Sequence, residues 1–295
     1  MTYLPDGMVR ADPLGAFPGT TQADWGRYPD LLDADGWLVV SVGSFLIRND
    51  AGVTLIDLGL GEVHFEIPGA ATYDGGQLLT QLRAEGLSPA DVDFVLFTHL
   101  HRDHVGWTGD RAGGLTFPRA RHLVEEKEWN YWRSSSDPVG PNPETVLGPL
   151  TPAIGFFSDK PPVPGIRALP TPGHTPGHTS FLITDPATGE ELLILGDAAH
   201  TRAQLENPDW TFRSDYDTRL AAGHRTDLLR RRGESESAIA GGHFSGNVFC
   251  HCRPASAFRA RVAGHVLKDP GIGEVSEQQD LAVADAEDLD GRRRD

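Results

Sequence analysis

Apolar and polar residues alternate along the chain in a pattern that is typical of a protein built from both sheets and helices. Trp37 to Ile47 and Val53 to Leu58 are rich in β-branched and apolar residues, and the turn-forming segment 48–52 between them predicts a hairpin. Similar short apolar runs predict further strands at Phe94 to Phe97, Ile166 to Leu169, Thr179 to Thr184, Leu192 to Leu195 and Ser237 to Ala240.

Three segments carry helical patterns: residues 78–86, 125–133 and 217–231. The first places leucines on one face and ends at a glycine. The second spaces two tryptophans three residues apart, as in core packing, and the third begins at Asp217, which can cap it. Because strands and helices follow no clean βαβ repeat, we expect an α/β (α+β) fold of four layers, an αββα sandwich of two mixed sheets with helices outside.

Some segments lack these patterns. Residues 1–35 are rich in Gly, Pro and Asp, and residues 269–295 are dominated by charged and small residues. We therefore expect an N-terminal extension at 1–35, one domain at 36–268 and a disordered acidic tail at 269–295. Residues 134–164 carry eight prolines, too many for one regular element. A substrate-covering loop and a plain connector are equal interpretations of this segment.

Charge and composition restrict the partners. The 295-residue chain has a formal net charge of −16 at pH 7, and nucleic acids and anionic membranes require basic patches, so neither is an expected partner. No signal-like N-terminus or apolar run of membrane-spanning length occurs, which favours a cytoplasmic protein. Cys250 and Cys252 are too close together to close a useful loop, and buried or incidental thiols are favoured over metal ligands.

The segment 94–104 concentrates the candidate chemistry. An apolar run is followed within six residues by the metal-binding side chains of His99, His101, Asp103 and His104. In an extended chain, side chains at i and i+2 project to the same side, so the first two histidines can bind one ion. Asp103 and His104 follow on a turn and can face a second ion. Imidazole with carboxylate suits Zn, Mn, Fe or Co, and the density of these residues disfavours a solvated loop.

Other predicted strands also end in ligand-type residues. His174 and His178 lie on a turn rich in Pro and Gly, and Asp197 and His243 each follow an apolar run. Strand ends converge when strands share sheets, so we expect these residues near the 94–104 segment. Residues 57–61 are interpreted as a tight turn near the same site.

These motifs resemble those of the metallo-β-lactamase superfamily over about residues 37–260. The similarity rests on Thr98 to His104, Pro172 to His178, Gly196-Asp197 and Gly242-His243. The resemblance implies an αββα sandwich with a dinuclear site between its sheets. It also implies the ligands of the two ions: one ion takes His99, His101 and His174, the other takes Asp103, His104 and His243, and Asp197 bridges both. Asp197 stands where the commonest zinc β-lactamases have a cysteine, which argues against β-lactam hydrolysis.

The segments around Trp107, Glu128 and 196–205 most resemble the branch that contains acyl-homoserine lactonases and methyl-parathion-hydrolase-like enzymes. This branch implies a metal-bridging hydroxide that attacks lactones, carboxylic esters or phosphotriesters. The expected cofactors are two divalent transition-metal ions, zinc first and Mn, Fe or Co as alternatives. The expected partner is a small-molecule substrate, and a homodimer is left open. A glyoxalase-II-like thioesterase and a metal-binding regulatory protein without turnover are the alternative functions.

The roles of several residues near the site stay open at this stage. Asp103 and His200 are the candidate catalytic residues. His200 can donate a proton to the leaving group or a hydrogen bond to the substrate oxygen, and the alternative is that it is only a polar loop residue. His178 is either an outer partner of the site or part of its turn, and Trp107 either walls a pocket or packs in the core. Arg102 is the only cation within the 94–104 motif. Its alternate position predicts a side chain directed away from the two histidines, so no anion-clamping basic cluster is expected.

Overall fold

The structure is a computed structural model that describes residues 1–157, 160–234 and 238–251. Within these residues, the strands of the larger sheet are β1 (Thr2–Ala11), β2 (Leu38–Asn49), β3 (Gly52–Ile56), β4 (His64–Ile67), β5 (Ala71–Asp74), β6 (Phe94–Leu96), β7 (Arg121–Val124) and β8 (Ile154–Phe156). Their order is β4-β5-β1-β2-β3-β6-β7-β8. The smaller sheet contains β9 (Ile166–Pro170), β10 (Thr179–Thr184), β11 (Glu191–Ile194), β12 (Ala238–Ala240) and β13 (Phe249–His251), in the order β13-β12-β11-β10-β9. Both sheets mix parallel and antiparallel pairs.

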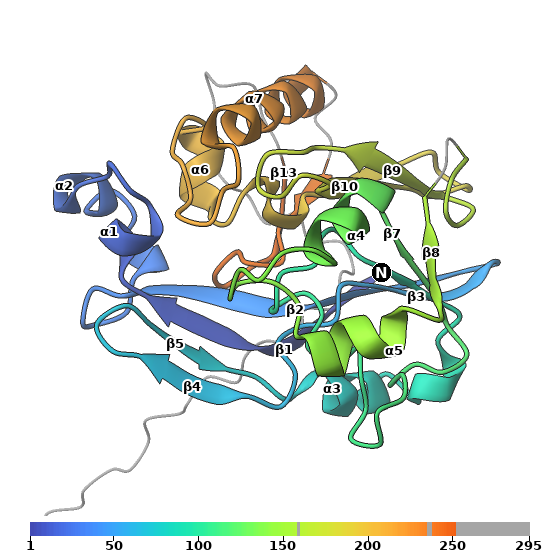
Figure 1. The fold of residues 1–295 in the computed structure, drawn as a ribbon. Coiled ribbons are helices and arrows are strands. Elements are labelled where there is room, and N and C mark those ends of the chain that lie inside the picture. The colour runs from blue at the N-terminus through green and yellow to red at the C-terminus, as the bar shows by residue number, and fades with distance from the viewer. Residues whose placement is uncertain (158–159, 235–237, 252–295) are drawn as a thin grey trace, which may run out of the picture.

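Helices cover the outer faces of the two sheets. They are α1 (Pro13–Ala16), α2 (Gln22–Trp25), α3 (Leu78–Ala84), α4 (Glu126–Trp132), α5 (Gly148–Leu150), α6 (Arg202–Glu206) and α7 (Thr218–Glu234). Figure 1 shows α6 and α7 over the smaller sheet and α3 beneath the larger one. The four-layer αββα expectation is therefore confirmed. Among the described residues, no helix combines the length and apolar character that a bilayer span requires.

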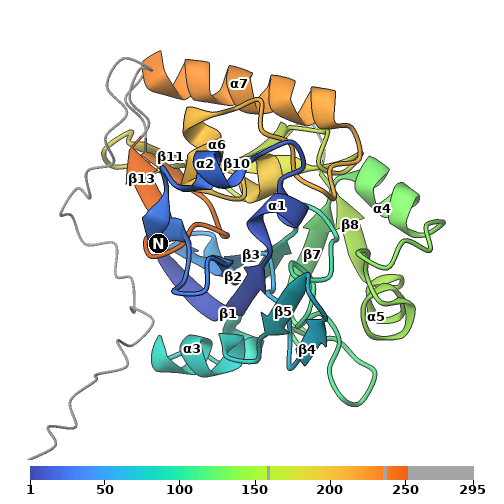
Figure 2. The ribbon, with the colours of Figure 1, turned by 90° about the vertical axis from the view of Figure 1, so that its left-hand side faces the viewer.

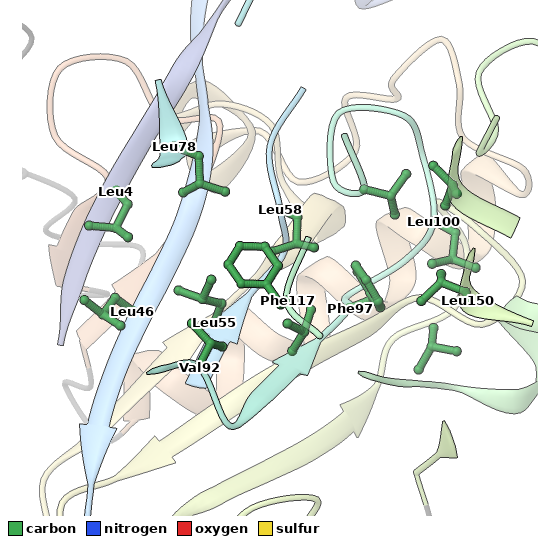
Figure 3. Close-up of a cluster of buried hydrophobic side chains, with 14 of the residues drawn as sticks. Leu4, Leu46, Leu55, Leu58, Leu78, Val92, Phe97, Leu100, Phe117 and Leu150 are labelled. Carbon is green, nitrogen blue, oxygen red and sulfur yellow. The ribbon is translucent and has the colours of Figure 1, made fainter. Parts of the chain in front are cut away.

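Side-chain alternation along the strands separates two apolar cores. On β2, Phe45 and Ile47 point into the space between the sheets, where they join Phe181 of β10. The intervening Leu46 points to the opposite face and packs with Leu78 of α3. Figure 3 shows part of this second core, which also includes Leu4, Leu55, Phe97 and Leu100.

The main predicted elements form as expected. β2 and β3 make the antiparallel hairpin, with Asn49 opposite Gly52. Helix α3 ends before Gly86, which has a φ of 77° that suits glycine. Asp217 accepts hydrogen bonds from two backbone N–H groups at the start of α7. The short strands β4, β5, β7, β8 and β13 were not predicted, because runs of three or four residues carry too little periodicity.

The N-terminal segment is not an extension, and that prediction was wrong. β1 lies inside the larger sheet, pairing with β2 from Thr2 to Ala11 and with β5 from Met8 to Ala11. Its register shifts between Pro5 and Gly7, and a Cβ on Gly7 would lie 1.9 Å from the Asp74 carbonyl oxygen. Pro5 and Gly7 thus flank a register shift within a strand, whereas the composition of residues 1–35 suggested a peripheral extension.

After β1, the chain packs against α6 and the loop that follows it. Figure 2 shows α1 and α2 beside α6, and Arg202 of α6 forms a 2.7 Å ion pair with Asp30. Cys250 is half-buried on β13 and packs against apolar residues of the smaller sheet. Cys252 and the predicted tail at 269–295 lie outside the described residues.

The Asp6 carboxylate on β1 joins three distant segments. It is fully buried and accepts hydrogen bonds from the backbone N–H groups of Leu60 (2.7 Å), Gly61 (3.0 Å), Gly76 (3.2 Å) and Leu78 (2.8 Å). A fifth bond comes from Trp107 Nε1 at 2.8 Å. The Leu78 bond also places a negative charge at the N-terminus of α3, where it is favourable. Trp107 is half-buried, packs against the apolar core that contains Leu78 and is not among the residues that line the cavity, so the core-packing interpretation is favoured.

His122 on β7 makes folding stability depend on pH. Its ring is fully buried, Nδ1 donates to the Ala120 carbonyl oxygen and Nε2 has no partner. Burial lowers the pKa of His122 to about 4. Between pH 6.5 and 4 the unfolded chain therefore binds more protons at this residue than the folded chain does, and stability falls as the pH falls.

Between pH 7.5 and pH 4.5, we expect the His122→Leu variant to lose about 2.5 kcal/mol less folding stability than the wild type. Urea unfolding of metal-free wild type and variant at pH 7.5 and pH 4.5 measures this loss. The exposed His64 provides the control, because His64→Leu replaces a histidine that the fold does not bury. Equal losses in wild type and His122→Leu would show that His122 does not control the acid response.

Candidate metal centre

Loops that follow four strands meet between the two sheets. Residues 97–104 follow β6, residues 171–178 follow β9, Gly196-Asp197 follows β11, and residues 241–243 follow β12. The Thr179 N–H donates to the Thr98 carbonyl oxygen at 2.9 Å, which ties the first loop to the smaller sheet. The structure brings the ligand-type residues of these loops together in two groups.

The first group consists of His99, His101, His174 and Asp197, all buried. Each offers a ligand atom within 4.8 Å of the others. His101 Nδ1 and His174 Nε2 are 2.9 Å apart. Asp197 Oδ2 lies 3.1 Å from His174 Nε2 and 3.6 Å from His99 Nε2. These atoms can surround one ion.

The second group consists of Asp103, His104 and His243, with ligand atoms that also lie within 4.8 Å of one another. His104 Nε2 and His243 Nε2 are 3.2 Å apart. Asp103 Oδ2 is 3.5 Å from His243 Nε2 and 3.9 Å from His104 Nε2. This group can surround a second ion.

Asp197 faces both groups with different oxygens. Its Oδ1 lies 3.2 Å from His104 Nε2 and 3.2 Å from His243 Nε2 in the second group. Its Oδ2 points into the first group, 3.1 Å from His174 Nε2. A carboxylate in this position can contact both ions at once.

The buried atoms of the site fit divalent metal ions. His99 Nε2 and Asp197 Oδ1 are buried without a hydrogen-bond partner, a costly state that a cation would relieve. Burial and the nearby His104 hold the pKa of His99 well below its usual value. Burial opposes ionisation of Asp197, but His104 and His243 hold the pKa of this carboxyl well below its usual value. Neutral imidazole and ionised carboxylate are the forms that bind a metal such as zinc.

Asp57 is a site residue whose role the sequence did not reveal. Its Oδ2 lies 2.9 Å from His104 Nδ1, and the carboxylate accepts hydrogen bonds from Thr98 N and Oγ1, each at 2.8 Å. Asp57 has a φ of 61°, which is unusual for a residue other than glycine. Residues 57–61 form the tight turn near the site that was expected, and Asp57 fixes the ring of His104 there. Its place at a strand end was the available signal.

Asp215 holds His174 in a similar way, and no sequence signal identified it. Its side chain is fully buried, with Oδ1 2.9 Å from His174 Nδ1, and Oδ2 accepts a hydrogen bond from the Phe212 N–H at 2.9 Å. Burial alone would lower the pKa of His174, but Asp197 and Asp215 raise it to about 9. The Tyr216 N–H also donates to the His174 carbonyl oxygen at 3.0 Å, so the loop at 207–217 is tied to this histidine.

We expect Asp215→Ala to weaken binding of the ion in the first group by roughly 10-fold to 100-fold, because a carboxylate on the far nitrogen orients the ring and raises its basicity. Competition with a chromophoric chelator measures the affinity. Asp209→Ala serves as the control, because Asp209 is an exposed carboxylate on the same loop. Equal affinities for Asp215→Ala and Asp209→Ala would contradict a role of Asp215 in holding His174.

His178 stands behind the site. Its Nε2 accepts a hydrogen bond from the Asp197 N–H at 2.9 Å, and its Nδ1 lies 3.1 Å from the Thr171 carbonyl oxygen. Burial lowers the pKa of His178 to about 3, so the ring is neutral. Of the two interpretations, the structure favours an outer partner that orients Asp197.

Glu128 of α4 joins two of the metal-site loops. It is fully buried and accepts hydrogen bonds from Leu100 N at 3.0 Å and Gly177 N at 2.9 Å. Thr175 Oγ1 and Trp132 Nε1 donate two more bonds, at 2.7 and 2.6 Å. Burial is the main cause that raises the pKa of this carboxyl. The four donors fix the loop of His101 against the loop of His174.

His200 lies at the edge of the first group. It is buried, its Nε2 is 3.1 Å from Asp197 Oδ2, and neither ring nitrogen has a hydrogen-bond partner. Phe212 stacks on the ring, with centroids 3.6 Å apart. Burial lowers the pKa of His200 to about 4, so the ring is neutral at pH 7. A polar loop residue would be exposed, and that interpretation does not fit these contacts.

A cavity of about 660 Å³ opens beside both groups. Its apolar wall comes from β1, β2 and β5 and includes Val9, Leu38, Val40 and Ala71. Asp137, Pro138 and Val139 of the proline-rich segment also line it. Part of that segment therefore lines the cavity, which favours the first of its two interpretations.

Basic residues do lie beside the site, although no basic cluster was expected near the 94–104 motif. Arg102 lines the cavity together with Arg213 of the loop that carries Phe212. Arg213 lies more than a hundred residues beyond the 94–104 motif, so the motif itself carries no sign of it. Two arginines from distant segments thus line the cavity beside the metal-type residues.

Comparisons with known proteins agree with this geometry. The family model described as the Metallo-beta-lactamase superfamily matches residues 38–243. An N-acyl homoserine lactonase of Bacillus sp. is 30% identical over 190 residues, which cover 60% of this chain and 69% of that protein. The N-acyl homoserine lactonase AttM of Agrobacterium fabrum is 32% identical over 189 residues, which cover 55% of this chain and 66% of that protein.

Among solved structures, the dizinc quorum-quenching lactonase AidC superposes with a TM-score of 0.76 at 23% identity. The superposition covers 85% of this chain and 90% of that chain. At 23% identity, the structural similarity to this lactonase supports the assignment of the fold.

Proposed function

This chain belongs to the metallo-beta-lactamase superfamily, and on that basis we propose that it is a dinuclear metal-dependent hydrolase that opens lactones. The observation that carries the proposal is the position of Asp197, whose two oxygens face two groups of buried ligand-type residues beside a cavity. The N-acyl homoserine lactonases among its relatives support the choice of lactones over other esters.

The proposed ligands of the two ions follow the two groups. One ion takes His99, His101 and His174, the other takes Asp103, His104 and His243, and Asp197 contacts both. Zinc suits these nitrogen and oxygen donors, with Mn, Fe or Co as alternatives. When bound, the two ions supply Lewis acidity that activates a water molecule and polarises the substrate carbonyl.

The chain's own groups bind and orient the substrate. The apolar wall of Val9, Leu38 and Val40 receives the acyl part and excludes water from it. His200, a neutral imidazole held by Phe212, donates its N–H to a substrate oxygen at the metal centre. Asp103 has a partly exposed side chain, and it faces substrate as well as the second ion.

A substrate panel tests the proposal with the zinc-loaded protein. It compares N-hexanoyl homoserine lactone, a glutathione thioester, an aryl phosphotriester and a β-lactam by kcat/KM. We expect the lactone to react at least about a hundredfold faster than the β-lactam. A faster thioester would support the glyoxalase-II-like alternative instead. Full metal loading without any turnover would support the regulatory alternative.

A further inference from the structure

Two arginine side chains on the cavity wall have no charged partner. Arg102 and Arg213 both line the cavity, and neither side chain makes a hydrogen bond or ion pair with any other residue in the described part of the chain. Arg102 is half-buried and Arg213 is exposed, so both guanidinium groups keep their N–H donors for a ligand that enters the cavity. Their positive charge lies beside the reaction centre, where it can attract an anionic group of a ligand.

Local contacts place each arginine at the cavity. The Arg102 guanidinium lies over the ring of Phe65, 5.9 Å from its centroid, and the Arg102 N–H donates to the Val139 carbonyl oxygen at 3.0 Å. The Arg213 N–H donates to the Ala16 carbonyl oxygen at 2.8 Å. Stacking on an aromatic ring leaves the edge N–H groups of a guanidinium free to bind an anion.

Five carboxylates line the cavity, and apart from the metal-site residues Asp103 and Asp197 each of them accepts hydrogen bonds from other groups. Asp12 accepts hydrogen bonds from the Leu14 and Gly15 N–H groups, and Asp137 accepts one from the Val139 N–H. Asp215 is paired with His174. None of the five forms an ion pair with Arg102 or Arg213.

Tyr73 lies in the same part of the cavity. Its ring stacks on Phe65, with centroids 4.4 Å apart and an interplanar angle of 8°. Burial and the charge of Asp103 raise the pKa of the Tyr73 hydroxyl, whereas Arg102 and Arg213 both act to lower it. The two arginines therefore act on one shared group, although they come from distant segments.

We propose that Arg102 and Arg213 together bind a carboxylate of the substrate, at the end of the molecule away from the bond that is cleaved. The inference rests on the proposed hydrolase function and narrows its substrate class to lactones or esters that carry an anionic group. The planar donors of a guanidinium match the two oxygens of a carboxylate, and charge-assisted bonds are stronger than neutral ones.

Equilibrium binding to the zinc-loaded protein tests the inference without requiring turnover. The probes are two ring-opened products, N-hexanoyl-homoserine and N-adipoyl-homoserine, whose six-carbon acyl chains end in a methyl group and a carboxylate. Isothermal titration calorimetry should show that the adipoyl compound binds about fivefold more tightly, as expected for a partly exposed ionic contact. Raising the ionic strength should reduce this preference.

Matched variants identify the residues responsible. Arg102→Gln and Arg213→Gln should each reduce the preference for the adipoyl compound, and the double variant should abolish it. Arg119→Gln is the control, because Arg119 is exposed and does not line the cavity. Equal binding of the two probes, or a preference that survives in the double variant, would overturn the inference.

The proposed function fails by a different measurement, namely the absence of lactone hydrolysis by the metal-loaded wild type. In that case the binding preference still decides whether the two arginines recognise a carboxylate.

Discussion

Asp197→Ala is expected to lower kcat/KM for lactone hydrolysis by at least about a thousandfold and to leave no more than one tightly bound ion per chain. The reason is the geometry of the carboxylate, whose Oδ1 faces His104 and His243 while Oδ2 faces His174. Its loss removes a ligand-type oxygen from both groups. It also removes the negative charge that offsets two bound cations in a buried site.

Steady-state kinetics and metal analysis by mass spectrometry measure the two effects on the same preparation. His64→Ala is the matched control, since His64 is an exposed histidine away from the site, and it should keep both activity and metal content. An Asp197→Ala protein that retains two ions and near wild-type turnover would rule out a shared role for this carboxylate.

Asp6→Ala is expected to reduce the free energy of unfolding by about 4 kcal/mol, because it leaves five hydrogen-bond donors without their acceptor in a buried place. The donors belong to the turn after β3, the start of α3 and Trp107. Urea unfolding of the metal-free protein gives the value without a contribution from metal binding.

Asp6→Asn tests whether charge or shape matters at this position. The amide keeps one acceptor oxygen and so should recover part of the loss, whereas its NH2 group faces donors and cannot replace the second oxygen. A loss below about 1 kcal/mol for Asp6→Ala would mean that water replaces the carboxylate and that β1 is less important than its contacts indicate.

The metal-type residues could be found from the sequence because their signal is local. His99, His101, Asp103 and His104 occur within six residues, and Asp197 and His243 each follow a short apolar run. Strand ends converge when strands share sheets, so these residues were expected near one another. Their division between two ions came from the resemblance to the metallo-β-lactamase superfamily.

The supporting residues could not be found in this way. Asp215 and Arg213 follow no strand and belong to no motif, and their roles arise only when the loop at 207–217 folds against His174 and Ala16. Such contacts are tertiary, and a single sequence records no trace of them.

Residues 1–35 show the opposite failure, in which a local signal misled. Pro5 and Gly7 indicated a loop, but both lie in a strand that pairs with β2 and β5. Pairing on two sides outweighs a weak local preference, because strand stability depends on neighbours more than on composition.

Titration of the metal-free protein with zinc tests the central claim of a dinuclear hydrolase most directly. Hydrolysis of N-hexanoyl homoserine lactone is measured against the number of ions bound per chain. The two groups around Asp197 predict that binding saturates at about two ions and that activity rises steeply only as the second ion binds. Full activity at one ion per chain, or activity in the metal-free protein, would contradict the dinuclear assignment.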